Sequence, residues 1–430
     1  DTMRPVRPLE LPDEQPARAR RPRGATRGSG RTRRWVNWGG PVAAAALVTV
    51  LALVLVILRQ APVRPSGSAP AATGTAVPVP GGTAVLGSIP RYYVALAGAG
   101  GGSSQLKAVV GDVSTGKTVA TLSPSARQNF YGVTGAADDR TFVVLNYDNA
   151  TGQTTWYRLR LTPGAARPAR LTRLPIKPVV AHIAGLALAP DGRELAVMWR
   201  SATTQSNAVT CLAVYSMTSG AALHTWITKG DNYNTIGGGS NGEALAWVDG
   251  GRSIDFRWTV ITAGAHGRAT QTVRRIDVTA SGPNLLSGSR VAVPLPPGTT
   301  VTKAGFSVPC DTSVTAGDGT VVCGTTSYSD VSFQEVCSKV PPAFVTYSGT
   351  TGKQLKVLYS YHGQCLEAQA TPVWTDSAAR HVVAFLLLSE KDVKTSATDR
   401  FGLVTDGHFI PLPKLVVGDG NAISPGGLAF

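Results

Sequence analysis

The sequence predicts an all-β domain with one membrane-spanning helix ahead of it. Glycine and proline number 48 and 29 in 430 residues, about 18% of the chain against roughly 12% in average proteins. Charged residues make up only 16%, well below the usual quarter, and many turns with few charges favour an all-β fold. This composition excludes a long coiled coil. The 43% of hydrophobic residues is enough to build a core, which argues against a fully disordered chain.

Short apolar runs from residue 91 onward are the predicted strands. Examples are residues 142–145, 195–199, 244–248 and 381–388. Valine-rich runs of this length, bounded by Gly, Asp, Ser and Thr, are typical of strands buried on both faces, although periodicity alone leaves a helix open for each run.

A repeated hairpin organises these strands. Its clearest copy has Ala-Pro-Asp-Gly at residues 189–192 between two apolar runs, where proline presets φ and Asp-Gly tolerates the positive φ of a tight turn. Similar copies begin near residues 131, 185, 240, 305, 371 and 422. Their mean spacing of about 58 exceeds the roughly 40–45 of compact repeats, so we expect some long loops.

A second hairpin with a Thr/Ser-Gly turn follows the first. We recognise it at residues 113–119, 215–223 and 347–355, and we interpret residues 149–153 as a fourth copy. Two hairpins give four strands, the make-up of a propeller blade, so six units predict a six-bladed β-propeller. A seventh blade stays open if a long insertion hides it. Because residues 91–122 lack the first hairpin and residues 422–430 lack the second, we predict that the two segments share one blade, which removes free sheet edges.

The Ala-Pro-Asp-Gly turn, the apolar strand after it and the Thr-Gly-Lys hairpin resemble the WD-repeat-like and TolB-like β-propellers. The resemblance covers residues 91–430 and is architectural, since the Trp-Asp dipeptides that end each blade of regular WD repeats do not occur in the sequence. The layout also resembles membrane-anchored propellers common in high-GC Gram-positive bacteria. This resemblance implies a propeller fold and no settled activity.

Three segments precede the predicted propeller. Residues 1–38 are an Arg/Pro-rich tail that cannot bury enough surface to fold. Residues 39–59 are the predicted transmembrane helix, because residues 42–58 carry no charge and some twenty residues at about 1.5 Å each span one hydrocarbon core. Residues 60–90, rich in Pro, Gly, Ala and Ser, form a linker.

The charge distribution predicts the orientation of this span. Residues 1–64 hold 12 Arg and 4 acidic residues of a chain whose formal net charge is +15, and most of these arginines precede the span. The positive-inside rule therefore places the N-terminus in the cytoplasm and the C-terminal domain outside the plasma membrane. A cleaved secretory signal stays open as an alternative, as does a missing segment before Asp1. Topology and anionic lipids account for the arginines, so we predict no nucleic-acid partner.

Four of the five cysteines lie close together in the sequence and are disulfide candidates. Outside the membrane disulfides persist, and four cysteines allow three pairings. We favour Cys310–Cys323, because both fall on one predicted hairpin, and Cys337–Cys365, which leaves Cys211 over. The alternative is five reduced thiols.

Two short motifs match catalytic patterns by letter only. Residues 111–118 satisfy the P-loop pattern and residues 238–242 the nucleophile-elbow pattern, but neither is followed by the helix that these sites require. The six histidines are scattered without metal-ligand spacing. We therefore predict no catalytic, cofactor-binding or metal site, and we expect aromatic residues such as Trp156 and Trp226 in the core more often than on a binding face.

The leading functional hypothesis is a single-span, extracytoplasmic propeller that binds a protein, peptide or glycan ligand without catalysis. It depends on fold analogy, because a scaffold does not define a function. One alternative is a propeller enzyme whose active site lines the central channel. Another is a transmembrane sensor whose tail binds a cytoplasmic regulator.

Overall fold

A computed structural model describes most of the chain from residue 89 onward. The described residues are 89–98, 105–201, 209–229, 234–236, 245–261, 269–296, 300–302, 305–329, 337, 341–363, 365, 367–389, 398–413 and 427–430. All of them belong to one compact unit, Val79–Phe430. The predicted tail, the predicted span and nearly all of the linker lie outside the described residues. Among the residues that are described, no helix has the length and apolar character needed to cross a membrane.

The described strands fall into six successive groups. The first group contains β26 (Leu428–Ala429), β1 (Tyr92–Ala97), β2 (Lys107–Asp112) and β3 (Thr118–Leu122). The second contains β4 (Gln128–Gly135), β5 (Thr141–Asp148), β6 (Gln153–Leu161) and β7 (Ala169–Arg173). The third contains β8 (Ala181–Leu188), β9 (Glu194–Ser201), β10 (Val209–Ser216) and β11 (Ala222–Lys229).

The later groups have the same plan with small additions. The fourth contains β12 (Asn234–Ile236), β13 (Leu245–Val248), β14 (Ser253–Ile261), β15 (Ala269–Asp277), the short helix α3 (Leu285–Gly288) and β16 (Ser289–Pro294). The fifth contains β17 (Thr300–Thr302), β18 (Gly305–Thr315), β19 (Val321–Ser329), β20 (Ala343–Tyr347) and β21 (Gln354–Ser360). The sixth contains β22 (Glu367–Thr375), β23 (Val382–Ser389), β24 (Thr398–Thr405) and β25 (His408–Pro411).

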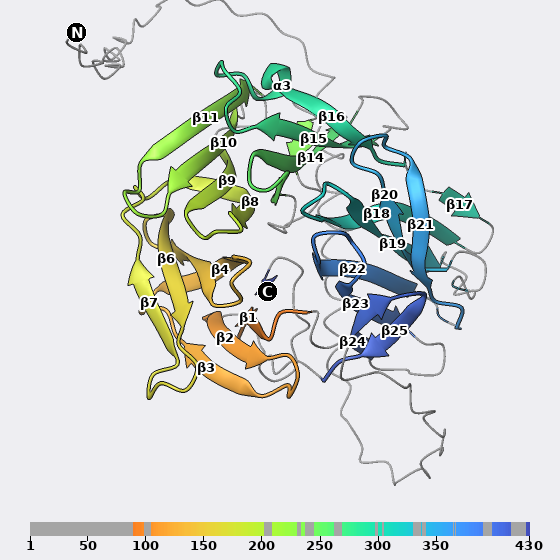
Figure 1. Cartoon of the computed structure of the whole chain (residues 1–430), viewed down its shortest axis with the longest axis horizontal. Helices are drawn as coiled ribbons and strands as arrows, with labels where there is room; N and C mark the ends of the chain where they lie inside the picture. Colours follow the sequence, from red (N-terminus) through yellow and green to blue (C-terminus); the bar gives the residue numbers. More distant parts are fainter. Residues whose placement is uncertain are drawn as a thin grey trace, which may run out of the picture. The chain divides into compact units, whose positions relative to one another are not determined.

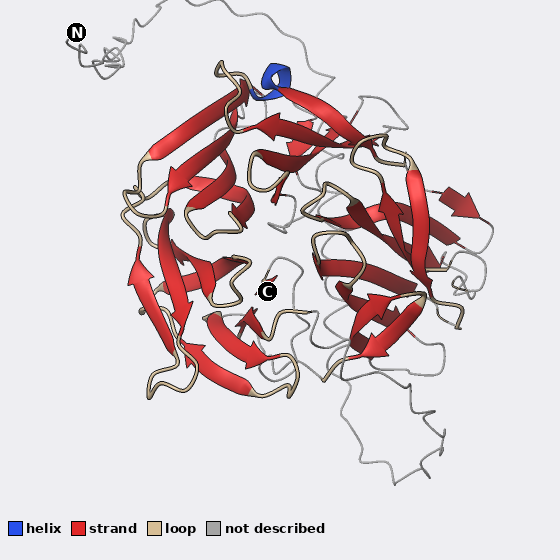
Figure 2. Ribbon diagram, viewed as in Figure 1, coloured by secondary structure: helices blue, strands red, loops and turns tan. Residues whose placement is uncertain are grey.

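Within this unit the groups surround a common centre (Figure 1) and consist almost wholly of strands (Figure 2). The first strands of neighbouring groups contact one another in turn, from β1 and β26 through β4, β8, β13, β18 and β22 back to β26. Groups five and six share one sheet, because β19 pairs with β20 through residues 321–324 and with β22 through residues 326–328. This is an all-β propeller-like fold with several blades.

The predicted first hairpins near residues 131, 185, 240, 305 and 371 are confirmed, whereas most of the one near residue 422 lies outside the described residues. The first strands after the opening group begin at residues 128, 181, 245, 305 and 367, within a few residues of the expected positions. An aspartate caps several of these turns: Asp138 Oδ1, for example, accepts hydrogen bonds from the backbone N–H groups of Arg140 and Thr141 at 3.0 and 2.8 Å. Such Asx turns satisfy the backbone where the chain reverses.

Backbone hydrogen bonds also link neighbouring first-hairpin turns. These bonds join Ala137 to Pro190, Asp249 to Gly317 and Asp318 to Ser377. Buried backbone groups need partners, and here the partner is the next turn along the ring. The turns therefore hold successive groups together at one end of the fold.

The second hairpins follow the prediction with one correction. The turns at residues 113–117, 217–221 and 349–353 join the last two strands of their groups. The turn at residues 149–152, which we interpreted as a fourth copy, instead joins β5 and β6, the second and third strands of group two. Thr-Gly turn chemistry closes any antiparallel pair of strands, so the motif alone does not reveal which pair it closes.

The predicted sharing of one sheet by both ends of the domain is confirmed. Strand β26 pairs with β1, with Val94 opposite Ala429. The ring of Phe430, at the end of this strand, packs against Tyr93, Trp374 and Phe401. The β26–β1 pairing therefore unites the two ends within group one, and the packing of Phe430 against Trp374 and Phe401 joins group one to group six.

The core consists of six apolar clusters, one at each junction between neighbouring groups. Sheets that stack face to face bury apolar side chains in this way. The cluster between groups four and five has eight buried residues, whereas that between groups three and four has fifteen. The small cluster marks a junction where polar side chains replace part of the apolar core.

Candidate functional site

Strand β14 carries a buried polar face at the junction between groups four and five. Its alternate residues Ser253, Asp255, Arg257 and Thr259 are all buried. The residues between them, such as Phe256, belong to the apolar cluster shared with group three. A strict polar–apolar alternation normally indicates a strand with one solvated face, so burial of both faces of this strand could not be expected from its residues.

One end of this polar face is a buried ion pair. The Arg275 guanidinium donates to the two Asp255 carboxylate oxygens at 2.6 and 2.8 Å, and Asp249 lies 3.4 Å from it. The hydrogen bond to Asp255 raises the pKa of Arg275. A two-point arginine–carboxylate pair fixes the orientation of both groups as well as neutralising their charges. This pair links β14 to β15 on the face that meets group five.

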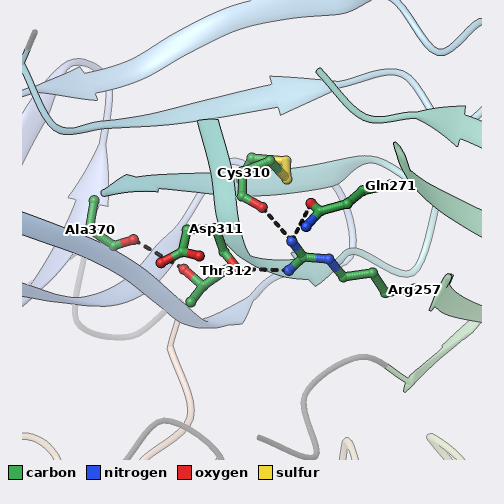
Figure 3. Close-up of a disulfide and its surroundings, with 7 residues drawn as sticks. Arg257, Gln271, Cys310, Asp311, Thr312 and Ala370 are labelled. Carbon is green, nitrogen blue, oxygen red and sulfur yellow. Dashed lines mark hydrogen bonds between the residues drawn. A yellow bond between two sulfur atoms is a disulfide. The ribbon is translucent and has the colours of Figure 1, made fainter. Parts of the chain in front are cut away.

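Arg257 occupies the middle of the polar face and reaches across to group five (Figure 3). Its side chain is 4% exposed. The guanidinium donates to the carbonyl oxygens of Cys310 and Asp311 at 2.7 and 2.8 Å and to Gln271 Oε1 at 2.5 Å. No carboxylate of the described residues forms an ion pair with it. Burial lowers the pKa of Arg257, and the charge of Asp311 partly opposes that shift.

The carbonyl groups that Arg257 binds belong to a bulge in β18. Pairing with β19 is interrupted between Val308 and Thr312, and Cys310 has a left-handed φ of 55°. A non-glycine residue adopts this conformation only where its surroundings hold it there. Beside the bulge, Thr326 Oγ1 donates to Asp311 Oδ2 at 2.7 Å. Bulges redirect side chains and end regular pairing. Arg257 holds this bulge in place through its hydrogen bonds to the two carbonyl groups.

A disulfide joins the same bulge to β19. The structure pairs Cys310 with Cys323 across a Cα–Cα distance of 4.4 Å, and Cys337 with Cys365 across 5.3 Å. This is the pairing that the sequence favours. Cys211 is the remaining thiol, and burial raises its pKa to about 12. A thiol this hard to ionise is a poor nucleophile.

Two atoms of the polar face lack a hydrogen-bond partner among the described residues. They are Arg257 Nε and Thr259 Oγ1, and both side chains are 4% exposed. Because residues 257 and 259 share one face of the strand, they present an N–H donor and a hydroxyl group on the same side. The arrangement binds polar groups and positions backbone, and it contains no nucleophile beside a base.

The other candidate features are structural in the described residues. The P-loop-like residues 111–118 form the end of β2, a turn and the start of β3, so the predicted hairpin is confirmed. The nucleophile-elbow-like residues 238–242 lie outside the described residues. His381 Nδ1 is 2.8 Å from Asp376 Oδ2 within one hairpin turn. Across the described ranges no three His, Cys, Asp or Glu residues form a group that could hold a metal ion.

The aromatic residues lie mainly in the core. Trp156, Trp226 and Tyr93 are at most 1% exposed. The buried polar residues that the sequence did not single out are Arg257, Arg275 and Asp255. The pattern Ser-x-Asp-x-Arg-x-Thr at residues 253–259 was the available signal, and it reads equally well as a solvated face.

Comparison with solved structures finds several distant likenesses. The chain is similar to TolB from Acinetobacter baumannii, with 10% identity over 77% of this chain and 68% of that one and a TM-score of 0.38. It is similar to a protein of unknown function from Bacteroides caccae, with 11% identity over 75% and 93% and a TM-score of 0.34. It is also similar to the tricorn protease, with 10% identity, a TM-score of 0.37, and coverage of 76% of this chain and 31% of that one. No protein-family model and no curated protein matches the chain.

Proposed function

We propose that this chain is a six-bladed, extracytoplasmic binding module, tethered to the plasma membrane by residues 39–59, whose outer strands bind a protein, peptide or glycan ligand. The six strand groups are its blades, and the paired ends close the ring. This organisation leaves the outermost strand of each blade on the rim, where a partner can reach it.

The observation that carries the proposal is the exposed apolar surface of β21. Leu355 and Val357 are 57% and 50% exposed on this strand. Strand β21 pairs with β20 on one side only among the described strands. Alternate side chains beside a free strand edge are what an added strand or an apolar ligand group recognises.

The disulfides support the extracytoplasmic placement. Both disulfides lie in or beside the blade that carries β21. Disulfides persist in oxidising compartments and are rare in the cytosol. They also stiffen a scaffold, which lowers the entropy lost on binding.

Site-specific photo-crosslinking of the full chain in intact cells tests the binding role. A benzophenone side chain at position 355 should give a discrete adduct, whereas the same probe at position 121, an exposed site on the outer strand β3, should not. Equal adduct patterns at the two positions would refute binding through β21.

Fractionation tests the tether separately. The full chain should stay in the membrane after a carbonate wash, and deletion of residues 39–59 should release it. External protease should digest the disulfide-bonded domain in intact cells. A mature protein shorter by the leader would favour the cleaved signal instead.

A further inference from the structure

Blade two carries a long stretch of uncompensated positive charge. Residues 149–190 contain five arginines and one lysine but no aspartate or glutamate. The six basic residues all belong to β6, to β7 or to the loops beside them: Arg158, Arg160, Arg167, Arg170, Arg173 and Lys177. We call this surface the basic rim.

The strand register places Arg158, Arg160 and Arg170 on one face of the two outer strands and Arg173 on the opposite face. Arg160 lies directly opposite Arg170, and Arg173 lies opposite Tyr157. Strand β7 is the last strand of its sheet, and it extends over about 17 Å at roughly 3.3 Å per residue. Arg167 precedes this strand and Lys177 follows it, so the positive charge continues past both ends.

The basic rim is exposed and unpaired. Except for the half-buried Arg158, its members are exposed. None of the six forms an ion pair or a side-chain hydrogen bond with a described residue. The charge of Arg160 acts on Asp138 and helps to lower the pKa of that residue, but Asp138 is already hydrogen-bonded to Thr141.

Protection of a sheet edge does not explain this accumulation. Charged residues on edge strands do prevent edge-to-edge aggregation. Yet the outer strands β3 and β25 contain no Lys or Arg, and β21 contains one lysine. Like charges placed opposite each other, as in the Arg160–Arg170 pair, destabilise a sheet, so the basic rim bears a cost that other blades avoid.

We propose that the basic rim binds an extended polyanion that carries phosphate or sulfate groups. The guanidinium fork matches the oxygens of such groups in two-point contacts. Unpaired cations on both faces of an edge strand and beyond both of its ends suit a linear chain of repeated anionic groups, whereas an interface with a folded protein is centred on an apolar patch with few charges. The inference rests on the proposed binding function, for which it names a second surface and the chemistry of a ligand.

Binding of inorganic polyphosphate by the purified full chain in detergent tests the inference. The variant Arg160→Gln/Arg170→Gln/Arg173→Gln removes three charges of the basic rim. The matched control, Lys107→Gln/Lys117→Gln/Arg290→Gln, removes three exposed charges from other blades. All six positions are exposed, so thermal unfolding should show that both variants fold.

The wild type should bind labelled polyphosphate with an affinity that falls steeply as salt rises. The basic-rim variant should lose at least tenfold in affinity, and its log–log salt slope should become shallower by about 2, since each lost phosphate contact removes roughly 0.7. The affinity of the control for polyphosphate should stay within about twofold of the wild-type affinity, because a localised site does not involve exposed charges on other blades. Absence of binding by the wild type, or equal losses in both variants, would overturn the inference.

A bilayer is the competing partner, and nanodiscs distinguish it. If residues 169–173 become protected from hydrogen exchange in phosphatidylglycerol discs but not in phosphatidylcholine discs, and polyphosphate is not bound, the partner is a membrane and the inference is wrong. Crosslinking at position 355 without polyphosphate binding would overturn only this inference. Polyphosphate binding without that adduct would instead overturn the role of β21.

Discussion

Replacing Arg257 by methionine should destabilise the domain more than the same replacement of an exposed arginine does. The substitution keeps the apolar length of the side chain and removes the guanidinium that holds Cys310 O, Asp311 O and Gln271 Oε1. Each buried acceptor left without a donor costs about 1–3 kcal/mol. Relief from burying a cation offsets several kcal/mol of this total, so we expect a net loss of about 2–4 kcal/mol.

Differential scanning calorimetry measures this loss. For a domain of roughly 340 residues the unfolding entropy is about 0.7 kcal/mol/K, so the expected fall in Tm is about 3–6 °C. The control is Arg290→Met, an exposed arginine on β16 of the same blade, which should cost under about 0.5 kcal/mol. Arg257→Lys should not restore the wild-type value, because an ammonium lacks the planar fork.

A second measurement distinguishes the loss of the hydrogen bonds from Arg257 to the bulge from the loss of side-chain packing. Loss of Arg257 should make the Cys310–Cys323 disulfide easier to reduce by dithiothreitol than Cys337–Cys365, because the bulge that holds Cys310 is released. A Tm for Arg257→Met within 1 °C of the wild-type Tm would show that Arg257 does not hold the bulge. Unchanged relative rates of reduction of the two disulfides would show the same.

Three further outcomes follow from the fold. Gly324→Ala should lower the free energy of unfolding by about 2–3 kcal/mol through overpacking, because a Cβ there would collide with the carbonyl oxygen of Ala370 on the next blade. Urea unfolding measures this loss, and a wild-type midpoint would show that the two blades can move apart to make room. Burial would raise the pKa of Asp138, but hydrogen bonds from Thr141 and nearby backbone groups outweigh it and lower that pKa. The stabilisation is therefore present above the unfolded pKa of about 3.9 and is lost as pH falls through the lower folded value. Asp138→Asn should be less stable than wild type at pH 7, and the difference between their urea midpoints should shrink as the pH falls below about 3.9. Alkylation of unreduced, denatured protein should modify Cys211 alone; five alkylated cysteines by mass spectrometry would contradict both disulfides.

The sequence predicted the repeating architecture because local chemistry specifies it. An Asp-Gly turn between apolar runs closes a hairpin wherever it occurs, so the first strands were located to within a few residues. The shared first sheet also followed, since residues 91–122 and 422–430 each lacked half of a unit. The turn at residues 149–152 shows the limit, because the same chemistry closes second and third strands as readily as third and fourth.

The polar junction could not be predicted for a different reason. Whether the Asp255–Arg257 face of β14 meets water or another sheet depends on the next blade, which follows tens of residues later. A local pattern carries no information on that neighbour. The basic rim was visible in the composition of residues 149–190, but only the register revealed that Arg160 and Arg170 lie side by side.

The pairing of β26 with β1 can form only after strands β1 to β25 have been synthesised. Val94 and Ala429 are more than 300 residues apart, and contacts of such long range make folding slow. During synthesis, strands β1 to β25 emerge while the innermost position of the first sheet is still unfilled. Until residues 427–430 arrive, that sheet has an exposed edge open to other chains. Shielding of β1 during this interval is therefore expected to raise the yield of native protein.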